Sequence, residues 1–146
     1  DDVPDGEHLV PLGKARVVRP GDDVTVIAWS GQVAVASKAA AVLAEEHRIS
    51  AEVIDLGSLV PLDIESNVAS IEKTGRAVVV QEAPLSAGFA SEVVATLCEE
   101  AFYALEAPVV RVSGYDVPYP VGLLEDRYVP DVDRVVDGAR RACDAT

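Results

Sequence analysis

Short apolar runs alternate with helix-like segments along this chain, and this alternation constrains the fold more than any other feature of the sequence. The strand-like runs cover residues 23–30, 50–56, 76–82 and 108–114. The segments with apolar residues at helical spacing cover residues 32–47, 63–73, 88–105 and 131–145. Nearly continuous apolar runs such as 23–30 (DVTVIAWS) are typical of strands covered on both faces. Because strand–helix–strand units require right-handed crossovers in a mainly parallel sheet, the sequence predicts a three-layer α/β/α sandwich.

Residues 1–13 (DDVPDGEHLVPLG) differ in composition from the rest of the chain. They hold two prolines, two glycines and four acidic residues, as expected of an arm or linker. The next segment, 14–19, is predicted to be a short strand, and residues 14–146 have the length of one domain. The chain contains no methionine. We therefore expect it to be a piece of a longer protein.

The formal net charge of −13 limits the partners that the protein can bind. Direct binding of nucleic acid is not expected, because the chain has no clustered Lys and Arg to neutralise phosphates. An acidic surface keeps a protein soluble and can also attract a basic partner, and both interpretations stay open. The chain has neither a signal-peptide pattern nor an apolar run of about 18 residues, which predicts a soluble, cytoplasmic protein without a membrane span.

The stretch 78–94 (VVVQEAPLSAGFASEVV) has the strand–loop–helix order at which α/β sheets usually place their ligands. A phosphate-binding loop would need a lysine after its glycines, or the spacing G-x-G-x-x-G, whereas Gly88 stands alone. Glu82 ends the strand without a nearby histidine as its acid–base partner. His8 lies in the arm, and His47 lies at a helix end, where a cation suits the helix dipole. We therefore expect no catalytic and no cofactor-binding residue in this chain.

Metal binding is not expected either. Asp131, Asp133 and Asp137 begin a helix, where acidic residues complement the dipole, and no calcium-loop pattern surrounds them. Cys98 and Phe102 both fall within a helical pattern. We expect Cys98 to be a small buried hydrophobe and Phe102 to lie on the buried apolar stripe of that helix.

Aromatic residues that follow strands are candidates for protein contacts. Trp29 lies at the end of the run 23–30 and is either part of the core or the anchor of an interface. The segment 115–120 (YDVPYP) places Tyr115 and Tyr119 on a stiff, proline-rich loop. Such a loop suits protein contacts, although it also fits a loop that only covers a sheet edge.

Several stretches together resemble one known family. They are 9–29 (LVPLGKARVVRPGDDVTVIAW), 52–63 (EVIDLGSLVPLD), 82–92 (EAPLSAGFASE) and 114–120 (GYDVPYP). They are similar to the transketolase-type C-terminal domain of the β subunit of 2-oxo acid dehydrogenase E1 components. The resemblance covers nearly the whole chain and is strongest to the branched-chain enzyme, with the pyruvate enzyme second. It implies a five-stranded, mostly parallel sheet in which the segment 14–19 or a neighbour runs antiparallel.

The resemblance also implies a function. The family's enzyme is an α2β2 assembly that decarboxylates a 2-oxo acid and passes the acyl group to a lipoyl-bearing E2 component. Thiamine diphosphate and magnesium lie between the α subunit and the N-terminal domain of β, so neither would be bound by this domain. Residues 1–13 would be the arm that leads from the missing pyrimidine-binding domain to the domain formed by 14–146.

The domain itself would serve assembly with the E1 α subunit and with a second β subunit. It would also help to dock the basic subunit-binding domain of the E2 acyltransferase. The alternatives are the pyruvate dehydrogenase β subunit, a non-catalytic acidic interaction domain, and a C-terminal domain of a transketolase-like enzyme or a deoxyxylulose-phosphate synthase.

The same resemblance supplies candidate interface residues. They are Trp29, Glu82, Pro84, Ala87, Gly88, Phe89, Tyr115 and Tyr119. We interpret the small residues of the loop 83–88 as a sign that a neighbouring backbone or subunit comes close. Glu82 and Ser91 would fix this loop and the start of the helix behind it. Relatives often have glycine where this chain has Ser30 and Ala87.

Overall fold

The computed structural model describes Gly6 and residues 9–145. Residues 1–5 and 7–8 of the predicted arm, with His8 among them, lie outside the described residues, and residues 9–13 form neither helix nor strand. In the part of the chain that the structure describes, no helix has both the length and the apolarity needed to cross a membrane.

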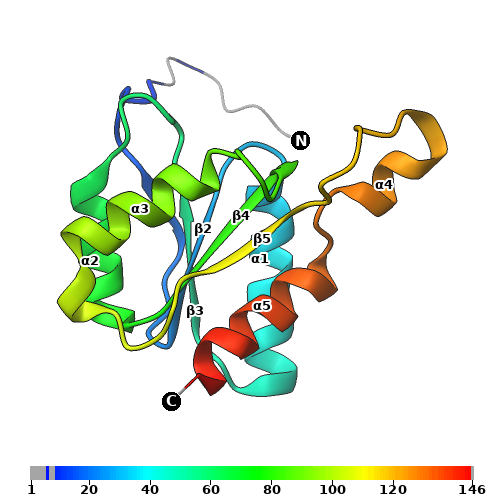
Figure 1. The fold of residues 1–146 in the computed structure, drawn as a ribbon. Helices are drawn as coiled ribbons and strands as arrows, with labels where there is room; N and C mark the ends of the chain where they lie inside the picture. The colour runs from blue at the N-terminus through cyan, green and yellow to red at the C-terminus, as the bar shows by residue number, and fades with distance from the viewer. Residues whose placement is uncertain (1–5, 7–8, 146) are drawn as a thin grey trace.

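A five-stranded sheet with the strand order β1-β3-β2-β4-β5 forms the middle layer of the domain (Figure 1). The strands are β1 (Arg16–Arg19), β2 (Val24–Ala28), β3 (Ala51–Asp55), β4 (Ala77–Pro84) and β5 (Val110–Gly114). Four of them run parallel, and β1 pairs antiparallel with β3. The predicted fold is therefore confirmed, including the antiparallel strand within 14–19.

Helices cover both faces of this sheet (Figure 1). One face is covered by α1 (Gln32–Val42), its continuation η1 (Leu43–His47) and α5 (Val132–Asp144). The other face is covered by α2 (Ile64–Thr74) and α3 (Ala90–Glu100). The helices and the sheet enclose two apolar clusters, one on each side of the sheet.

The central strand β2 explains why the run 23–30 is apolar at nearly every position. All five residues of β2 are buried. Successive side chains of a strand point to opposite faces, so Val24 and Val26 pack with α1 and α5, whereas Ile27 packs with α2 and α3.

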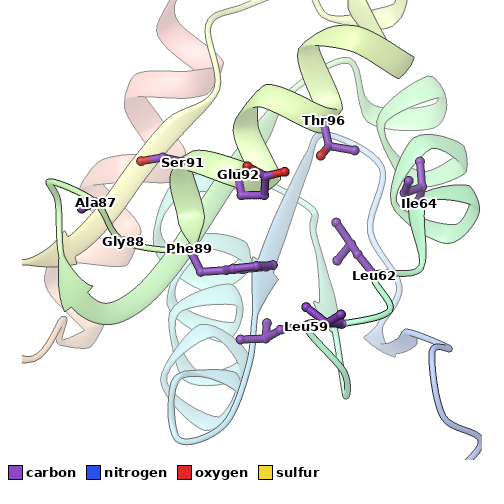
Figure 2. Close-up of a pocket in the computed structure, with 10 residues that line it drawn as sticks. Leu59, Leu62, Ile64, Ala87, Gly88, Phe89, Ser91, Glu92 and Thr96 are labelled. Carbon is purple, nitrogen blue, oxygen red and sulfur yellow. The ribbon is translucent and has the colours of Figure 1, made fainter.

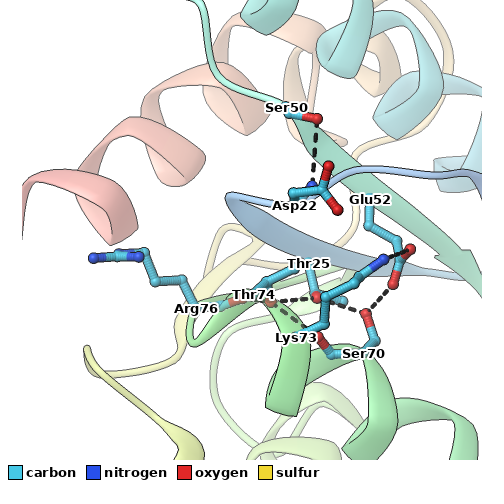
Figure 3. Close-up of polar contacts among 8 residues, drawn as sticks. All are labelled: Asp22, Thr25, Ser50, Glu52, Ser70, Lys73, Thr74 and Arg76. Atoms are coloured by element: carbon cyan, nitrogen blue, oxygen red, sulfur yellow. Dashed lines mark hydrogen bonds and ion pairs between the residues drawn. The ribbon is translucent and has the colours of Figure 1, made fainter.

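A buried polar network holds α2 against β2 and β3 (Figure 3). The hydroxyl oxygen of Thr25 lies 2.7 Å from that of Ser70 and 2.8 Å from that of Thr74. The carboxylate of Glu52, which is almost fully buried, accepts hydrogen bonds from Ser70 Oγ and Lys73 Nζ. Buried polar groups are stabilising only when they are satisfied in this way. The network therefore fixes one position of α2 on the sheet.

Asp63 caps the first turn of α2, as predicted from the sequence. Its carboxylate accepts hydrogen bonds from Ser66 Oγ at 2.7 Å, Ser66 N at 3.3 Å and Ala15 N at 2.9 Å. Lys14 Nζ lies 3.6 Å away. Burial raises the pKa of the Asp63 carboxyl, whereas these hydrogen bonds and the charge of Lys14 lower it. The lowering effects together are larger, so the pKa lies below its ordinary value. Asp63 thus ties the residues before β1 to the start of α2.

We expect Asp63→Ala to lower the free energy of unfolding by about 1–2 kcal/mol at neutral pH. A carboxyl whose pKa is lower in the folded state stabilises the fold above its unfolded pKa, about 3.9, and this contribution is lost as the pH falls through the folded pKa. The difference between wild type and variant should therefore shrink in acid, which urea unfolding at neutral pH and at about pH 3 would measure. A difference that does not change with pH would contradict this interpretation. Asp131→Ala, which removes the exposed cap of α5, is the matched control.

The helix predicted over 88–105 is shorter in the structure. It ends at Glu100, because Ala101 leaves the helical conformation with φ −123° and ψ 20°. A single 3-10 turn, η2 (Phe102–Ala104), follows. The prediction that Phe102 lies on the buried stripe is wrong, since its side chain is 64% exposed. Cys98, predicted to be buried, is exposed as well.

Candidate subunit interface

Two loops meet at the carboxyl ends of β4 and β5, and they carry most of the predicted interface residues. One loop, residues 85–89, leads from β4 into α3, and the other follows β5. Asp116 joins them by accepting hydrogen bonds from Ser86 N at 2.8 Å and Ser86 Oγ at 2.7 Å. These bonds lower the pKa of the Asp116 carboxyl. Segments that are 30 residues apart in the sequence thus form one surface.

Gln81, which the sequence reasoning missed, holds the first loop in place. Its Nε2 donates to Pro84 O at 2.9 Å and to Ser113 Oγ at 3.2 Å, and its Oε1 accepts from Ala90 N at 2.8 Å. The expectation that Glu82 fixes the loop is wrong, because Glu82 is exposed and its buried neighbour makes these bonds. A glutamine that directly follows a run of valines was the available signal, since a buried amide needs hydrogen-bond partners.

Ser91 helps to hold the first loop through its contact with Arg111. Its Oγ accepts from Arg111 Nη1 at 2.7 Å, and the same nitrogen donates to Leu85 O at 3.2 Å. The guanidinium of the edge strand β5 therefore links the loop to the first turn of α3, which is the part of the expectation for Ser91 that the structure supports.

Packing within the domain explains why residue 88 is a glycine. A Cβ at this position would lie 2.0 Å from Gln81 Nε2 and 2.5 Å from Pro84 O. Of the two explanations given for this small residue, the close approach of a neighbouring backbone is supported by Pro84 O, whereas the approach of a subunit stays a prediction. Backbone strain lies instead at Ala87, with φ 57°, and at Ser30, with φ 54°. Glycine adopts positive φ without strain, so it would fit both positions.

An apolar groove of about 770 Å³ lies between α3 and the segment before α2 (Figure 2). Its lining residues are Leu59, Val60, Leu62, Ile64, Ala87, Gly88, Phe89, Ser91, Glu92 and Thr96. Figure 2 shows Phe89 on one side of the groove, with Leu59 and Leu62 on the other. The ring of Trp29 packs edge-on against that of the lining residue Phe89, with 6.1 Å between the ring centroids. Trp29 is thus a partly buried member of the core that supports the groove.

The second loop projects away from the body of the domain (Figure 1). It contains the short helices η3 (Gly122–Leu124) and α4 (Glu125–Tyr128). Aromatic rings fix its base. The ring of the buried Tyr128 lies 4.9 Å from that of Tyr119 and 6.4 Å from that of Tyr115, and the guanidinium of Arg134 lies 4.6 Å from the Tyr115 ring centre. The hydrogen bond that the Tyr119 hydroxyl donates to Glu125 raises the pKa of Tyr119 to about 12.

The tip of the projecting loop is apolar and uncovered. The exposed fractions are 54% for Val117, 85% for Val121, 97% for Leu123 and 56% for Leu124. Single exposed apolar residues are ordinary, but a contiguous exposed set on a fixed support is typical of protein–protein contact surfaces.

The eight predicted interface residues fall into three groups. Glu82, Ala87, Tyr115 and Tyr119 are exposed, Trp29, Pro84 and Phe89 are partly buried, and Gly88 is buried. The structure brings all of them except Trp29 to the two loops or to the strand end before them. Their contact with another subunit stays a prediction.

The residues of this domain do not fit a site for magnesium or for the diphosphate that magnesium would hold. Within Gly6 and residues 9–145, no three His, Cys, Asp or Glu side chains gather closely enough to hold a metal ion. The side chain of Gln81 fills the space beside the loop 85–89, and the loop carries no lysine that would pair with a phosphate. We therefore derive no catalytic step from this domain.

Comparisons with known proteins give relatives over nearly the whole chain. The family model for the transketolase C-terminal domain matches residues 13–135. The pyruvate dehydrogenase E1 component subunit beta of Leifsonia xyli subsp. xyli is 50% identical over 136 residues, which cover 93% of this chain and 40% of that protein. The mitochondrial 2-oxoisovalerate dehydrogenase subunit beta of Dictyostelium discoideum is 47% identical over 131 residues, covering 90% of this chain and 35% of that protein.

A solved structure has the same fold. It is described as a split-gene transketolase in an inactive beta4 tetramer, and it superposes with a TM-score of 0.83 at 33% sequence identity. The match covers 99% of this chain and 46% of that chain. This chain thus spans less than half the length of that structure and 35–40% of the two curated relatives.

Proposed function

The chain belongs to the transketolase C-terminal domain family, and from that premise we propose that it is the C-terminal domain of the β subunit of a 2-oxo acid dehydrogenase E1 component. Identities of 41–50% to β subunits of such enzymes support this proposal. The complete enzyme would decarboxylate a 2-oxo acid with thiamine diphosphate and magnesium and transfer the acyl group to the lipoyl group of E2. We place it in the cytoplasm, although the Dictyostelium relative is mitochondrial.

The role that we propose for the domain itself rests on the structure of the projecting loop. Its base is locked by Tyr115, Tyr119 and Tyr128, while its apolar tip has no cover within the described chain. A rigid support with exposed apolar side chains suits assembly, because little conformational entropy is lost when the surface is covered. We propose that this loop and the neighbouring groove contact the α subunit or a second β subunit, and that the domain also helps to dock the basic binding domain of E2.

For the substrate we propose a branched-chain 2-oxo acid. We base this on the resemblance inferred above for the stretches 28–33 (AWSGQV), 82–92 and 114–120, and on the Dictyostelium relative, which is named for 2-oxoisovalerate. Pyruvate is the second candidate, because the Leifsonia relative is named for it. Since we propose that the substrate is bound outside this domain, specificity has to be measured on the complete enzyme.

The test uses the complete β subunit co-expressed with its α subunit. We expect assembly into α2β2, turnover that requires thiamine diphosphate and magnesium, and a kcat/KM about tenfold or more higher for 2-oxoisovalerate than for pyruvate. The present chain alone should show no turnover. The reverse preference would identify the pyruvate enzyme, and no turnover with any α subunit would favour a non-catalytic interaction domain.

The same preparation tests the projecting loop. Val121→Ser combined with Leu123→Ser should weaken association of α and β in sedimentation by about tenfold or more, because truncation of buried anchors dominates interface energies. Val17→Ser, an exposed position on the edge strand β1, is the control and should leave assembly unchanged. Unchanged assembly of the double variant would show that the loop tip does not face a subunit.

A further inference from the structure

A small cavity lies beside the edge strand β5, at the end where this strand leads into the projecting loop (Figure 1). Its volume is about 200 Å³, which is several times the roughly 30 Å³ that one water molecule occupies. The residues that line it include Leu85, Arg111, Ser113, Tyr115, Asp116 and Arg134. Two guanidinium groups from different elements, β5 and α5, therefore line one cavity in a chain whose net charge is −13.

The guanidinium of Arg111 is held so that one of its edges stays open. Its Nη1 donates to Leu85 O at 3.2 Å and to Ser91 Oγ at 2.7 Å. Its Nε and Nη2 form no hydrogen bond or ion pair with any residue that the structure describes. These two nitrogens lie on the same edge of the planar group, and their N–H bonds match the two oxygens of a carboxylate. Arg111 therefore has an unused fork for a planar anion.

Arg134 is also fixed by contacts within the domain. Its Nη2 donates to Ser113 O, and its Nη1 donates to Tyr128 O at 3.4 Å. Its Cζ lies 4.6 Å from the centre of the Tyr115 ring. A guanidinium that is already held in one place loses little conformational entropy when it binds an anion. Arg134 is therefore suited to support the binding of an anion in this cavity.

The positive charge of the cavity is only partly compensated. Within Gly6 and residues 9–145, neither Arg111 nor Arg134 forms an ion pair. The carboxylate of Asp116 lines the same cavity, but its two oxygens accept hydrogen bonds from Ser86 N and Ser86 Oγ. The lining thus contains two cations and one carboxylate, and a bound anion would balance the second cation.

We propose that this cavity, here named the arginine cleft, binds the carboxylate of a small organic acid. The open edge of Arg111 would hold both carboxylate oxygens, and the charge of Arg134 would strengthen this contact. Leu85 and Tyr115 are 39% and 51% exposed, and they would contact the rest of the ligand. This favours an acid with a short apolar or aromatic body. Because we derive no catalytic step from this domain, the acid would be bound and not converted.

The same carboxylate chemistry could come from a glutamate or aspartate side chain of a partner protein. We favour the small acid, because an acidic partner surface would be repelled by the net charge of −13, whereas a small acid carries only one negative charge. The proposal does not depend on the proposed function, since every group that it uses lies within this chain.

The test titrates the ¹⁵N-labelled chain with phenylacetate at about 0.15 M salt and follows the arginine Nε–H signals by NMR. We expect a Kd of about 1 mM, with the signals of Arg111 and Arg134 shifting most. Phenylacetamide has the same shape without the charge and should bind at least about tenfold more weakly. A capped peptide with one glutamate between glycines represents the partner protein, and it should bind at least about threefold more weakly than phenylacetate.

Three substitutions separate the fork from charge and from loop structure. Arg111→Lys keeps the charge but removes the fork, so it should weaken phenylacetate binding by about fivefold, and the signal that it removes identifies Arg111. Arg140→Gln removes an exposed charge elsewhere on α5 and should change affinity by less than about twofold. Ser91→Ala removes a partner of Arg111 Nη1 but leaves the open edge, so it should also change affinity by less than about twofold.

Equal binding of phenylacetate and phenylacetamide would overturn the proposal, because the carboxylate would then not be recognised. So would an unshifted Arg111 signal at about 20 mM phenylacetate. Equal losses in Arg111→Lys and Ser91→Ala would show that the loop, and not the fork, determines affinity, and would overturn it as well. Tighter binding of the glutamate peptide than of phenylacetate would overturn the assignment to a small acid. Backbone spectra of the variants should match that of the wild type away from the two loops, because no altered side chain is buried.

Discussion

Gly88→Ala is expected to lower the free energy of unfolding by about 2–4 kcal/mol, although it adds only one methyl group. The new Cβ would lie 2.0 Å from Gln81 Nε2, so the glutamine would have to leave its position. It would then lose the bonds to Pro84 O and Ala90 N, and buried polar groups would be left without partners. A domain of this size has about 5–15 kcal/mol of stability, so the variant should fold with a melting temperature lower by about 5–15 °C.

Ala87→Gly, one residue away, is the matched control, and its expected effect has the opposite sign. Ala87 has a φ of 57°, a conformation that costs an L-residue about 1–2 kcal/mol. Part of the gain from glycine is offset by the entropy of a more flexible unfolded chain, which leaves a net stabilisation of about 0.5–1 kcal/mol. Urea unfolding of both variants measures the pair of effects. A stable Gly88→Ala domain that fails to assemble with its α subunit would support the explanation based on a neighbouring subunit.

Gly88 and Ala87 also show how much of this loop could be predicted from the sequence. The loop between β4 and α3 was predictable in place, because a valine run, a proline and a glycine mark a strand, its end and a turn. The reason for Gly88 was not predictable, because it depends on where the Gln81 side chain lies in three dimensions. The sequence alone treats each small residue of the loop alike, whereas the structure separates a packing requirement at Gly88 from backbone strain at Ala87.

In the remainder of the fold, too, some features could be predicted from the sequence and others could not. Periodicity and composition predicted the strands, the two helical layers and the Asp63 cap, since these follow from local spacing. The position of Phe102 was mispredicted, because helical spacing was extended past Ala101, where the helix ends. Helix ends are the least predictable boundaries when no glycine or proline marks them, and α3 ends at an alanine. The candidate interface was located by resemblance to a family, and its link through Ser86 and Asp116 required coordinates.

The second large expected effect concerns the ion pair between the buried Glu52 and the partly exposed Lys73. Lys73→Met should lower the free energy of unfolding by about 2–3 kcal/mol. The side chain of Glu52 is 5% exposed, so removal of the ammonium leaves its charge without compensation in the interior. The expected loss is smaller than for a fully buried pair, because the Lys73 side chain is 41% exposed and its contact with water already weakens the attraction.

Two variants isolate the charge from the packing. Glu52→Gln combined with Lys73→Met should recover most of the loss, because a neutral amide still accepts the hydrogen bond from Ser70 and carries no charge that needs a partner. Asp137→Asn, which removes the exposed 4.0 Å pair with Arg141 in α5, should change stability by less than about 0.5 kcal/mol. All four proteins are compared by urea unfolding at one salt concentration. If Lys73→Met costs no more than Asp137→Asn, water reaches Glu52, and the network in Figure 3 does not determine the position of α2 on the sheet.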